Sequence, residues 1–407
     1  MHGRTLLVRV SGRDQPGITA ALLDVLAKAD VDVLDIEQVT TRERLTLDLL
    51  IDFPSDDIAL KDLLFLGWER GLSIDFEVLD AVPPAPGLVR HAVTVIGRTL
   101  SAAALGSVAN AIASSDANID RITRLSRYPV VSYELVVSGG DIERMRGALV
   151  EASAMHGVDV AVQREGLERR AKRLVVLDVD STLVQDEIIE LLAEEAGRAD
   201  EVRAITQRAM AGELEFEQAL RERVALLAGL DEGALDRVRA RARLTPGART
   251  FVRTLKRLGF RIAIVSGGFT SFTDDLAAQL GIDHAYGNEL EVVDGRLTGQ
   301  VVGRVIDRQR KAQILEEVAA LEGIPLEQTV AVGDGANDLD MLAKAGLGIA
   351  FNAKPIVREA ADTAVSVPYL DAVLFILGIR RADVDDADAA DPDVNDDLPL
   401  VPGTPPA

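Results

Sequence analysis

A short apolar run that ends in two carboxylates constrains the fold of this chain more than any other feature. Residues 174–177 (Leu-Val-Val-Leu) show no polar alternation, which is typical of a parallel strand buried on both faces. Asp178 and Asp180 follow directly, at the strand end where open α/β sheets bind ligands. Side chains at i and i+2 share a face, so these two anions would repel unless a cation or a proton lies between them. Mg²⁺, which prefers oxygen ligands, suits such a pair. For an isolated Asp-x-Asp, a solvated turn after a strand would be the better interpretation, so the rest of the chain must decide.

Length and composition limit the classes of protein to consider. The chain has 407 residues, a net charge of −22 and no Cys. This length predicts two or three domains. The negative charge argues against nucleic acid or an anionic membrane surface as the main partner. Without Cys, disulfides, thiol nucleophiles and thiolate metal sites are excluded. The sequence has no apolar run of membrane-spanning length and no signal-peptide pattern, so we expect a cytoplasmic protein without a membrane partner.

The first part of the chain repeats one pattern of strands and helices. Residues 1–82 predict the order βαββαβ, with a first strand at 6–10, a helix at 18–29 and a closing strand at 72–78. After a Pro-rich linker at 83–87, the order recurs over 88–164 with an offset of about 86 residues. We therefore expect two small ferredoxin-like antiparallel sheets, each with two helices on one face.

Residues 14–18 (Asp-Gln-Pro-Gly-Ile), between the first strand and the first helix, resemble the ligand loop of ACT domains, regulatory modules that commonly bind amino acids. A Gly at this place lets the backbone approach a ligand, and the following helix N-terminus can receive a carboxylate. The resemblance implies a regulatory site at Asp14 and Gly17 and a second one near Gly106. In the second unit, however, residues 99–101 (Thr-Leu-Ser) replace the Pro-Gly. The resemblance also implies a homodimer, and serine as the regulatory amino acid.

The pattern changes to α/β alternation over residues 172–380. Residues 185 to about 245 are helical in pattern, with no Pro before Pro246, and predict a helical cap over the strand ends. Further strands at 261–265, 329–332, 347–351 and 363–367, with helices between them, complete a doubly wound, mostly parallel sheet. The segment 382–407 is rich in Asp, Ala and Pro, and we expect it to be disordered.

Three predicted strands end in polar residues, which a doubly wound sheet brings to one crevice. The second strand ends in Ser-Gly-Gly at 266–268, and the third in Gly-Asp-Gly-Ala-Asn-Asp at 333–338. With Lys311, the crevice would hold one ammonium group, backbone amides and four carboxylates, those of Asp178, Asp180, Asp334 and Asp338. Carboxylates at this density need Mg²⁺, and Mg²⁺ with a Lys and amides suits a phosphoryl group.

This ordered set of motifs resembles the haloacid dehalogenase superfamily of aspartyl-phosphate phosphatases, and within it the phosphoserine phosphatases, over about residues 172–375. The resemblance implies that Asp178 is the nucleophile and forms a phosphoaspartyl intermediate. It implies that Asp180 is the general acid for the leaving serine oxygen and then the base for water. Asp178, Asp334 and the backbone carbonyl of Asp180 would ligate Mg²⁺, and Asp338 would act through a metal-bound water.

The same resemblance assigns the substrate contacts. Ser266, Gly267 and Lys311 would hold the phosphoryl oxygens, with a polar contact from Asn337 beside them. In the cap, Glu187 matches the acid that meets the substrate ammonium, and Arg223 would pair with the substrate carboxylate. The other cap positions of the family segment are Met210, Gly212 and Phe216. Without the resemblance, Glu187 and Arg223 would be unremarkable surface charges on helices.

The sequence therefore predicts a Mg²⁺-dependent O-phospho-L-serine phosphatase that completes serine biosynthesis and is regulated by amino-acid binding. One alternative is a phosphatase or phosphotransferase that acts on another small phosphomonoester, although the cap charges argue against sugar phosphates. Another is an amino-acid-responsive regulatory protein with a vestigial site, against which the intact set of Asp and Lys residues argues.

Overall fold

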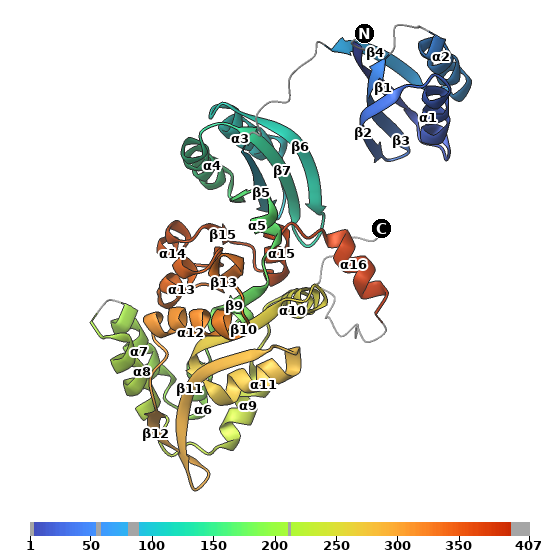
Figure 1. Ribbon diagram of the computed structural model, residues 1–407. Helices are drawn as coiled ribbons and strands as arrows, with labels where there is room; N and C mark the ends of the chain where they lie inside the picture. The colour runs from blue at the N-terminus through green and yellow to red at the C-terminus, as the bar shows by residue number, and fades with distance from the viewer. Residues whose placement is uncertain (1–3, 54–57, 80–88, 211–212, 392–407) are drawn as a thin grey trace. The chain divides into compact units, whose positions relative to one another are not determined.

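The computed structural model describes residues 4–53, 58–79, 89–210 and 213–391. The chain separates into two compact units, Met1–Leu88 and Val89–Ala407, which Figure 1 shows in blue and in teal to red. Within the described residues, no helix is both long and apolar enough to cross a membrane.

The first unit is a four-stranded antiparallel sheet with two helices on one face. Its elements are β1 (Arg4–Arg13), α1 (Ile18–Lys28), β2 (Asp32–Thr41), β3 (Arg44–Phe53), α2 (Ile58–Arg70) and β4 (Ser73–Leu79). The strand order is β2-β3-β1-β4. Alternate residues of the central strands, such as Val8 and Leu47, form a core with Leu22 of α1 and Leu63 of α2. The predicted βαββαβ order is confirmed.

The second unit begins with a repeat of this arrangement. Its elements are β5 (Arg90–Gly97), α3 (Ala102–Ala113), β6 (Ala117–Ser126), β7 (Val131–Gly139), α4 (Ile142–His156) and β8 (Asp159–Arg164), in the strand order β6-β7-β5-β8. Helices α3 and α4 cover one face. Residues of the sheet's other face, including Ile96 and Ala161, belong to the same buried cluster as Leu370 and Phe375 of the α/β domain. This second small sheet therefore shares a core with the α/β domain.

A seven-stranded sheet forms the centre of the α/β domain. Its strands are β9 (Leu174–Leu177), β10 (Arg261–Phe269), β11 (His284–Val293), β12 (Arg296–Val302), β13 (Thr329–Gly333), β14 (Gly348–Phe351) and β15 (Thr363–Val365). The order is β12-β11-β10-β9-β13-β14-β15, and only the β11–β12 hairpin is antiparallel. The chain passes from β9 to β10 on one side and later to β13 on the other, which makes the carboxyl end of β9 the topological switch point. The predicted doubly wound sheet is confirmed.

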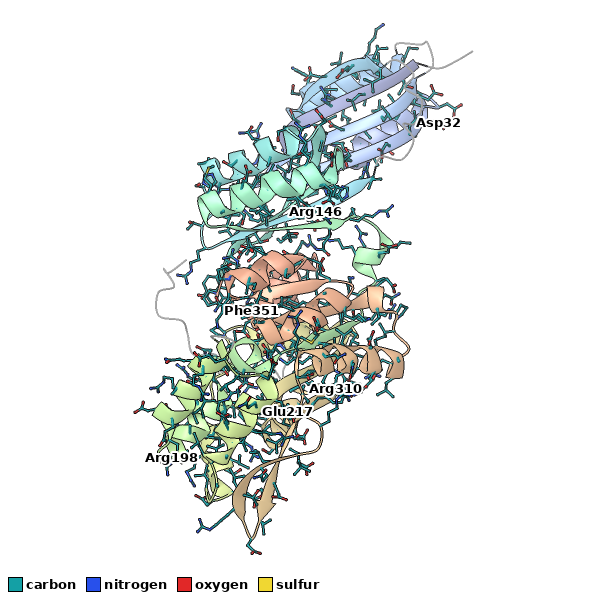
Figure 2. All side chains as sticks on the ribbon, turned by 90° about the vertical axis from the view of Figure 1, so that its left-hand side faces the viewer. Asp32, Arg146, Arg198, Glu217, Arg310 and Phe351 are labelled. Atoms are coloured by element: carbon teal, nitrogen blue, oxygen red, sulfur yellow. The ribbon has the colours of Figure 1, made fainter. Side chains whose placement is uncertain are left out.

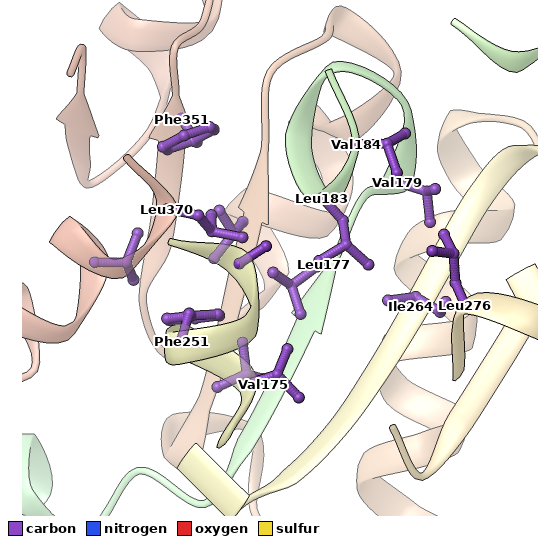
Figure 3. Packing of buried hydrophobic residues seen from close by; sticks show 14 of the residues in the cluster. Val175, Leu177, Val179, Leu183, Val184, Phe251, Ile264, Leu276, Phe351 and Leu370 are labelled. Carbon is purple, nitrogen blue, oxygen red and sulfur yellow. The ribbon is translucent and has the colours of Figure 1, made fainter. Parts of the chain in front are cut away.

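Helices cover both faces of this sheet. On one face, Val175 and Leu177 of β9 belong to one buried cluster with Phe251 of α10 and Leu276 of α11, and Figure 3 shows these four side chains. On the other face, Val176 packs with residues of α12, α13 and α14. The covering helices are α10 (Ala248–Arg257), α11 (Thr270–Leu280), α12 (Arg308–Leu321), α13 (Leu339–Lys344), α14 (Pro355–Ala360) and α15 (Val373–Ile376).

The predicted cap is inserted between β9 and α10. It contains α6 (Ile188–Glu195), α7 (Ala199–Met210), α8 (Phe216–Ala225) and α9 (Gly233–Arg241). The chain enters and leaves the cap side by side, because Val184 and Leu244 form an isolated antiparallel bridge. In Figure 2, Glu217 marks α8 of the cap, and Arg310 marks the start of α12, the helix that carries Lys311.

The segment after residue 381 differs from the expected disorder. Arg381–Ala389 forms helix α16, with Val384 buried. Asp388 accepts hydrogen bonds from Arg253 and Arg257 of α10. Acidic composition predicts disorder, but here arginines more than one hundred positions earlier in the chain pair with Asp388. The composition of the segment alone does not reveal these partners. Residues 392–407 and the predicted linker at 83–87 lie outside the described residues.

Candidate active site

A fully buried lysine joins two carboxylates at the switch point of the sheet. Lys311 Nζ lies 2.6 Å from Asp178 Oδ1 and 2.7 Å from Asp338 Oδ1. The Lys311 side chain is 0% exposed, and Asp178 is 3% exposed. A buried ammonium group is stable only when it is paired and hydrogen-bonded. The three side chains come from the residue after β9, from α12 and from the segment after β13, so the fold assembles them from distant parts of the sequence.

Local backbone features set the positions of these charges. The Asp178 amide donates to Val332 O at 2.9 Å and extends the pairing of β9 with β13 by one residue. At position 333, a Cβ atom would lie 2.5 Å from Asp338 Cγ, so only Gly leaves room for this carboxylate. Asp338 Oδ2 also accepts from the Gly335 amide at 3.0 Å. Lys311 lies in the first turn of α12, which begins at Arg308.

The carboxylates of Asp178, Asp334 and Asp338 have oxygen atoms within 4.8 Å of one another. Burial and then the charge of Asp338 raise the pKa of Asp178 well above its usual range, although Lys311 opposes the shift. Burial and Asp338 likewise raise the pKa of Asp334 to about 6. Burial would lower the pKa of Lys311, but the two carboxylates outweigh it and raise the pKa. Since one ammonium does not balance three carboxylates, this set of oxygen donors fits a hard divalent cation such as Mg²⁺.

Asp180 is held on the other side of the site. Its Oδ2 accepts from Ser266 Oγ at 2.8 Å, and its Oδ1 accepts from the Ile188 amide at 2.9 Å. Ser266 Oγ itself accepts from the Gly268 amide at 2.7 Å. A Cβ atom at position 268 would lie 3.1 Å from Asp180 Oδ2. The small residues after Ser266 therefore let this loop approach the carboxylate closely.

The cap brings charged residues to the same place. Glu187 Oε1 accepts from Ser181 Oγ at 2.9 Å. The Glu187 side chain keeps contact with solvent, but protein atoms surround much of it. Burial and then the charge of Asp180 raise its pKa to about 7. Burial lowers the pKa of Arg223, while the charges of Glu187 and Asp180 act in the opposite direction. The carboxyl group of Glu187 and the guanidinium of Arg223 therefore lie close enough to interact electrostatically with each other and with Asp180.

Phe216 connects the cap with the loop after Ser266. A Cβ atom at position 267 would lie 3.0 Å from Phe216 Cζ, so the aromatic ring rests on Gly267. Asn337 lies in the short 3₁₀ helix Ala336–Asp338 that follows β13, and a Cβ at position 335 would meet its Oδ1 at 2.1 Å. Met210 is the last residue of α7, and Gly212 lies outside the described residues.

The residues expected to bind a regulatory amino acid lie in the two βαββαβ units, outside their strands. Gly17 precedes α1 with a φ of 89° and no Cβ contact within 4 Å. Asp14 Oδ2 accepts from Thr40 Oγ1 of β2 at 3.3 Å. Gly106 lies inside helix α3 and not at its N-terminus, where Ser101 caps the helix by accepting from the Ala104 amide at 3.1 Å. The second repeat therefore closes its helix end with its own side chain.

Known proteins match nearly the whole length of the chain. Residues 175–343 match the family model of haloacid dehalogenase-like hydrolases, and residues 4–77 and 89–163 match models of ACT domains. A phosphoserine phosphatase of Streptomyces coelicolor is 55% identical over 98% of this chain and 98% of its own. Phosphoserine phosphatase SerB2 of Mycobacterium tuberculosis is 50% identical over 95% of this chain and 96% of its own.

The chain belongs to the phosphoserine phosphatase family of haloacid dehalogenase-like hydrolases. Solved structures agree with this membership. A probable phosphoserine phosphatase from Vibrio cholerae shares 37% identity with a TM-score of 0.56, covering 70% of this chain and 86% of that one. A haloacid dehalogenase family hydrolase from Salmonella enterica serovar Typhi shares 30% identity with a TM-score of 0.63, covering 70% and 98%.

Sequence reasoning missed two residues that support the site in this phosphoserine phosphatase family member. Thr206 of α7 lies with its Oγ1 3.5 Å from Arg223 Nη1, and the Ala219 carbonyl accepts from Arg223 Nε at 3.2 Å. Asn288 of β11 is 2% exposed and bonds to the loop after Ser266. Neither residue has a local sequence signal, because each acts only through a contact made by the folded chain.

Proposed function

We propose that this protein is a Mg²⁺-dependent phosphatase that hydrolyses O-phospho-L-serine to L-serine and phosphate, the last step of serine biosynthesis. The observation that carries the proposal is the buried Asp178–Lys311–Asp338 cluster, which lies at the switch point next to a cap carrying Glu187 and Arg223. The names of the relatives in Streptomyces and Mycobacterium support this choice of substrate.

In the first step, a carboxylate oxygen of Asp178 attacks phosphorus in line with the leaving serine oxygen. A bond forms between this oxygen and phosphorus, the bond from phosphorus to the serine oxygen breaks, and a phosphoaspartyl intermediate results. Lys311 lies 2.6 Å from the nucleophile, so its fixed charge can stabilise negative charge on the phosphoryl oxygens in the transition state.

Asp180 supplies the proton that the leaving oxygen needs. In the second step, the same residue takes a proton from water, which attacks phosphorus and releases Asp178 and inorganic phosphate. Its partner Ser266 suits both steps, because a hydroxyl group can donate a hydrogen bond to a carboxylate or accept one from a carboxylic acid. The distance of 2.8 Å from Ser266 Oγ to Asp180 Oδ2 permits either arrangement.

Asp178, Asp334 and the backbone carbonyl of Asp180 would hold Mg²⁺, with Asp338 acting through a water molecule. When bound, Mg²⁺ would offset the charge of the crowded carboxylates and withdraw electron density from the phosphoryl group. The described residues offer oxygen donors from three carboxylates within 4.8 Å of one another, which supports this choice of cation.

The cap would select the amino-acid part of the substrate. We assign the substrate ammonium to Glu187 and the substrate carboxylate to Arg223, whose planar guanidinium matches a planar anion. Phe216, resting on Gly267, would cover the phosphoryl group and exclude water during the first step. Met210, Gly212 and Asn337 complete the proposed substrate contacts.

The ACT domains would make the enzyme responsive to an amino acid. We propose that free serine binds at the first domain near Asp14 and Gly17, and that the enzyme is a homodimer. Gly106 is the weaker part of the proposal, because it lies inside α3 and the N-terminus of that helix is capped by Ser101. We further propose that the enzyme acts in the cytoplasm, where amino acids are synthesised.

A substrate panel tests the function. Phosphate release from O-phospho-L-serine is compared with release from sugar phosphates and nucleoside monophosphates, each with Mg²⁺ and with a chelator. We expect a strong preference for phosphoserine that depends on Mg²⁺. Equal, slow hydrolysis of every substrate would contradict the roles assigned to Glu187 and Arg223. The absence of any hydrolysis with Mg²⁺ would contradict the assignment as a phosphatase.

A further inference from the structure

A buried asparagine connects the two elements to which we assign phosphoryl binding. Asn288 of β11 is 2% exposed. Its Nδ2 donates to Gly267 O at 2.8 Å, in the loop after Ser266. Its Oδ1 accepts from the Ile306 amide at 2.8 Å, just before the helix that carries Lys311. A carbonyl can only accept and an amide N–H can only donate, so the two partners fix the orientation of the Asn288 side chain.

The backbone around Asn288 explains why a side chain is needed here. Strands β10 and β11 pair regularly up to Val265 and Tyr286, and the next paired residues are Phe269 and Asn288. Residues 266–268 therefore bulge out of the sheet opposite Gly287 alone. A bulge takes peptide groups out of the ladder and leaves them to other partners. At position 287, a Cβ atom would lie 2.5 Å from the Thr270 amide nitrogen, so Gly287 lets β11 approach closely enough for Asn288 to reach the bulge.

The peptide group between Gly267 and Gly268 is held at both ends. Asn288 binds its carbonyl oxygen at 2.8 Å, and Ser266 Oγ accepts from its N–H at 2.7 Å. Ser266 Oγ in turn bonds to Asp180. A continuous set of hydrogen bonds thus leads from Asn288 through the loop to the residue that we assign as the general acid.

The hydrogen bond from the Ile306 amide to Asn288 affects the position of Lys311 through the start of α12. Ile306 precedes Asp307, the N-cap residue of α12, whose side chain accepts from the Arg310 amide at 2.7 Å. The Lys311 amide donates to Asp307 O at 2.9 Å. The position of residue 306 therefore sets where the first turn begins and where Lys311 emerges.

We propose that Asn288 is a positioning residue that holds the Gly267–Gly268 peptide and the start of α12 at a fixed separation. The loop amides and Lys311 then meet the phosphoryl group as one preorganised unit. The inference rests on the proposed function for its choice of ligand, a phosphoryl group, but it concerns a residue outside the assigned contacts. A backbone fixed in advance costs no reorganisation when charge develops in the transition state.

The test uses two substitutions in the full chain and one control. Asn288→Asp keeps the shape and the acceptor for Ile306, but it loses the donor to Gly267 and sets a carboxylate against a carbonyl oxygen. Asn288→Ala removes both bonds. Leu290→Ala on the same strand removes apolar packing from the neighbouring core cluster and serves as the control for a loss of stability alone. The melting temperature is measured for each variant, and all comparisons are made below the lowest one.

The measurements separate phosphoryl binding from amino-acid recognition. For Asn288→Asp, we expect kcat to fall and the Kd of inorganic phosphate with Mg²⁺ to rise by about 10- to 100-fold each. The Kd of L-serine at the active site, in competition with substrate, should stay unchanged. Leu290→Ala should keep kcat and both Kd values. The proposal would be wrong if Asn288→Asp had the same kcat and the same phosphate Kd as Leu290→Ala. It would also be wrong if Asn288→Asp weakened serine binding and phosphate binding equally.

The same experiment remains informative if the substrate assignment fails. Inorganic phosphate binding and hydrolysis of p-nitrophenyl phosphate do not require phosphoserine to be the substrate. A wild-type protein that ignores phosphoserine but binds phosphate would overturn the proposed function only. A normal response to phosphate and p-nitrophenyl phosphate in Asn288→Asp would overturn the role of Asn288 only.

Discussion

At the residue scale, the balance of charge around Asp178 controls what the site can bind. Lys311 is fully buried and offers one positive charge to two carboxylates, and the carboxylate of Asp334 lies within the same cluster. Removing one partner of a buried ion pair leaves the other charge buried without compensation. The free-energy cost of that unpaired charge exceeds the net stabilisation that the pair provides. The site should therefore respond strongly to the loss of the lysine and to pH.

Lys311→Met keeps an unbranched side chain, one heavy atom shorter, and removes its charge. We expect the free energy of unfolding at pH 8 to fall by about 3–5 kcal/mol and turnover to be lost. The effect should be smaller at pH 5, where the carboxyl groups can take up protons. Urea unfolding at both pH values measures it. Lys344→Met, which removes only the exposed pair with Glu316, should cost less than about 1 kcal/mol, and equal effects of the two substitutions would contradict the account.

The raised pKa values of Asp178 and Asp334 predict how stability changes with pH when no metal is bound. Their folded pKa values lie above the unfolded ones, so the folded protein binds more protons in the pH range between the two values. Their contribution to stability therefore falls as pH rises from about 4 through the folded pKa. With a chelator, Asp334→Asn should gain melting temperature relative to wild type at pH 8 but not at pH 4. Mg²⁺ should raise the wild-type melting temperature more at pH 8 than at pH 5, and the opposite order would count against a carboxylate metal site.

At the element scale, we propose that the cap makes the phosphoryl site selective for an amino-acid substrate. Glu187 has a pKa of about 7 because of burial and the charge of Asp180, so it is half neutral near physiological pH. A neutral acid can still accept a hydrogen bond from the substrate ammonium, but it attracts it more weakly than a carboxylate does. The kcat/KM for phosphoserine should therefore rise as pH increases through 7, in addition to any dependence shared with p-nitrophenyl phosphate.

Glu187→Gln isolates this contribution. We expect KM for phosphoserine to rise by about 10- to 100-fold, because a charge-assisted hydrogen bond is lost. The additional pH dependence should disappear, and hydrolysis of p-nitrophenyl phosphate should change little. Steady-state kinetics from pH 6 to 8.5 measure both effects. Glu217→Gln, on the exposed side of α8 and paired with Arg221, is the control, and a matching rise in KM there would argue against the assigned role of Glu187.

The elements themselves were largely predictable, and the exceptions share one cause. Apolar runs and caps identified the buried strands and the helices, because those signals are local. Helix α16 was missed, since its Asp388 is stabilised by Arg253 and Arg257 from a distant helix. Asn288 was missed for the same reason, because its partners Gly267 and Ile306 are brought to it only by the sheet.

At the scale of the whole molecule, the two ACT domains differ in the cores to which their buried residues belong. The first has its own buried core. The second shares a core with the phosphatase domain through residues such as Ile96 and Val130. The Gln163 side chain also donates to Ile376 O, and buried Arg169 bonds to Glu134 of β7. The repeat in the sequence predicted both ACT domains. Only the packing of the folded chain shows that the phosphatase domain covers one sheet face of the second ACT domain.

Truncation should distinguish the two domains. A chain of residues 89–407 should fold and keep its kcat for phosphoserine, because the core of the first domain is separate. A chain of residues 165–407 should melt at a lower temperature and aggregate, because it exposes apolar residues around Leu370 and Phe375. Thermal denaturation and phosphate release measure both chains. Equal stability of the two truncated chains would show that the second ACT domain is not part of the catalytic core.

The central claim is that Asp178 carries the phosphoryl group during turnover, and trapping the intermediate tests it most directly. The full-length enzyme is mixed with ³²P-labelled O-phospho-L-serine and Mg²⁺, quenched in acid and digested. We expect an acyl phosphate, stable in acid and cleaved by hydroxylamine, on the peptide that contains Asp178. The label should be absent with a chelator and in Asp178→Asn, and present in Asp340→Asn, a surface control paired with Arg308. A label on another residue, or turnover of phosphoserine by Asp178→Asn at a rate near that of wild type, would contradict the account.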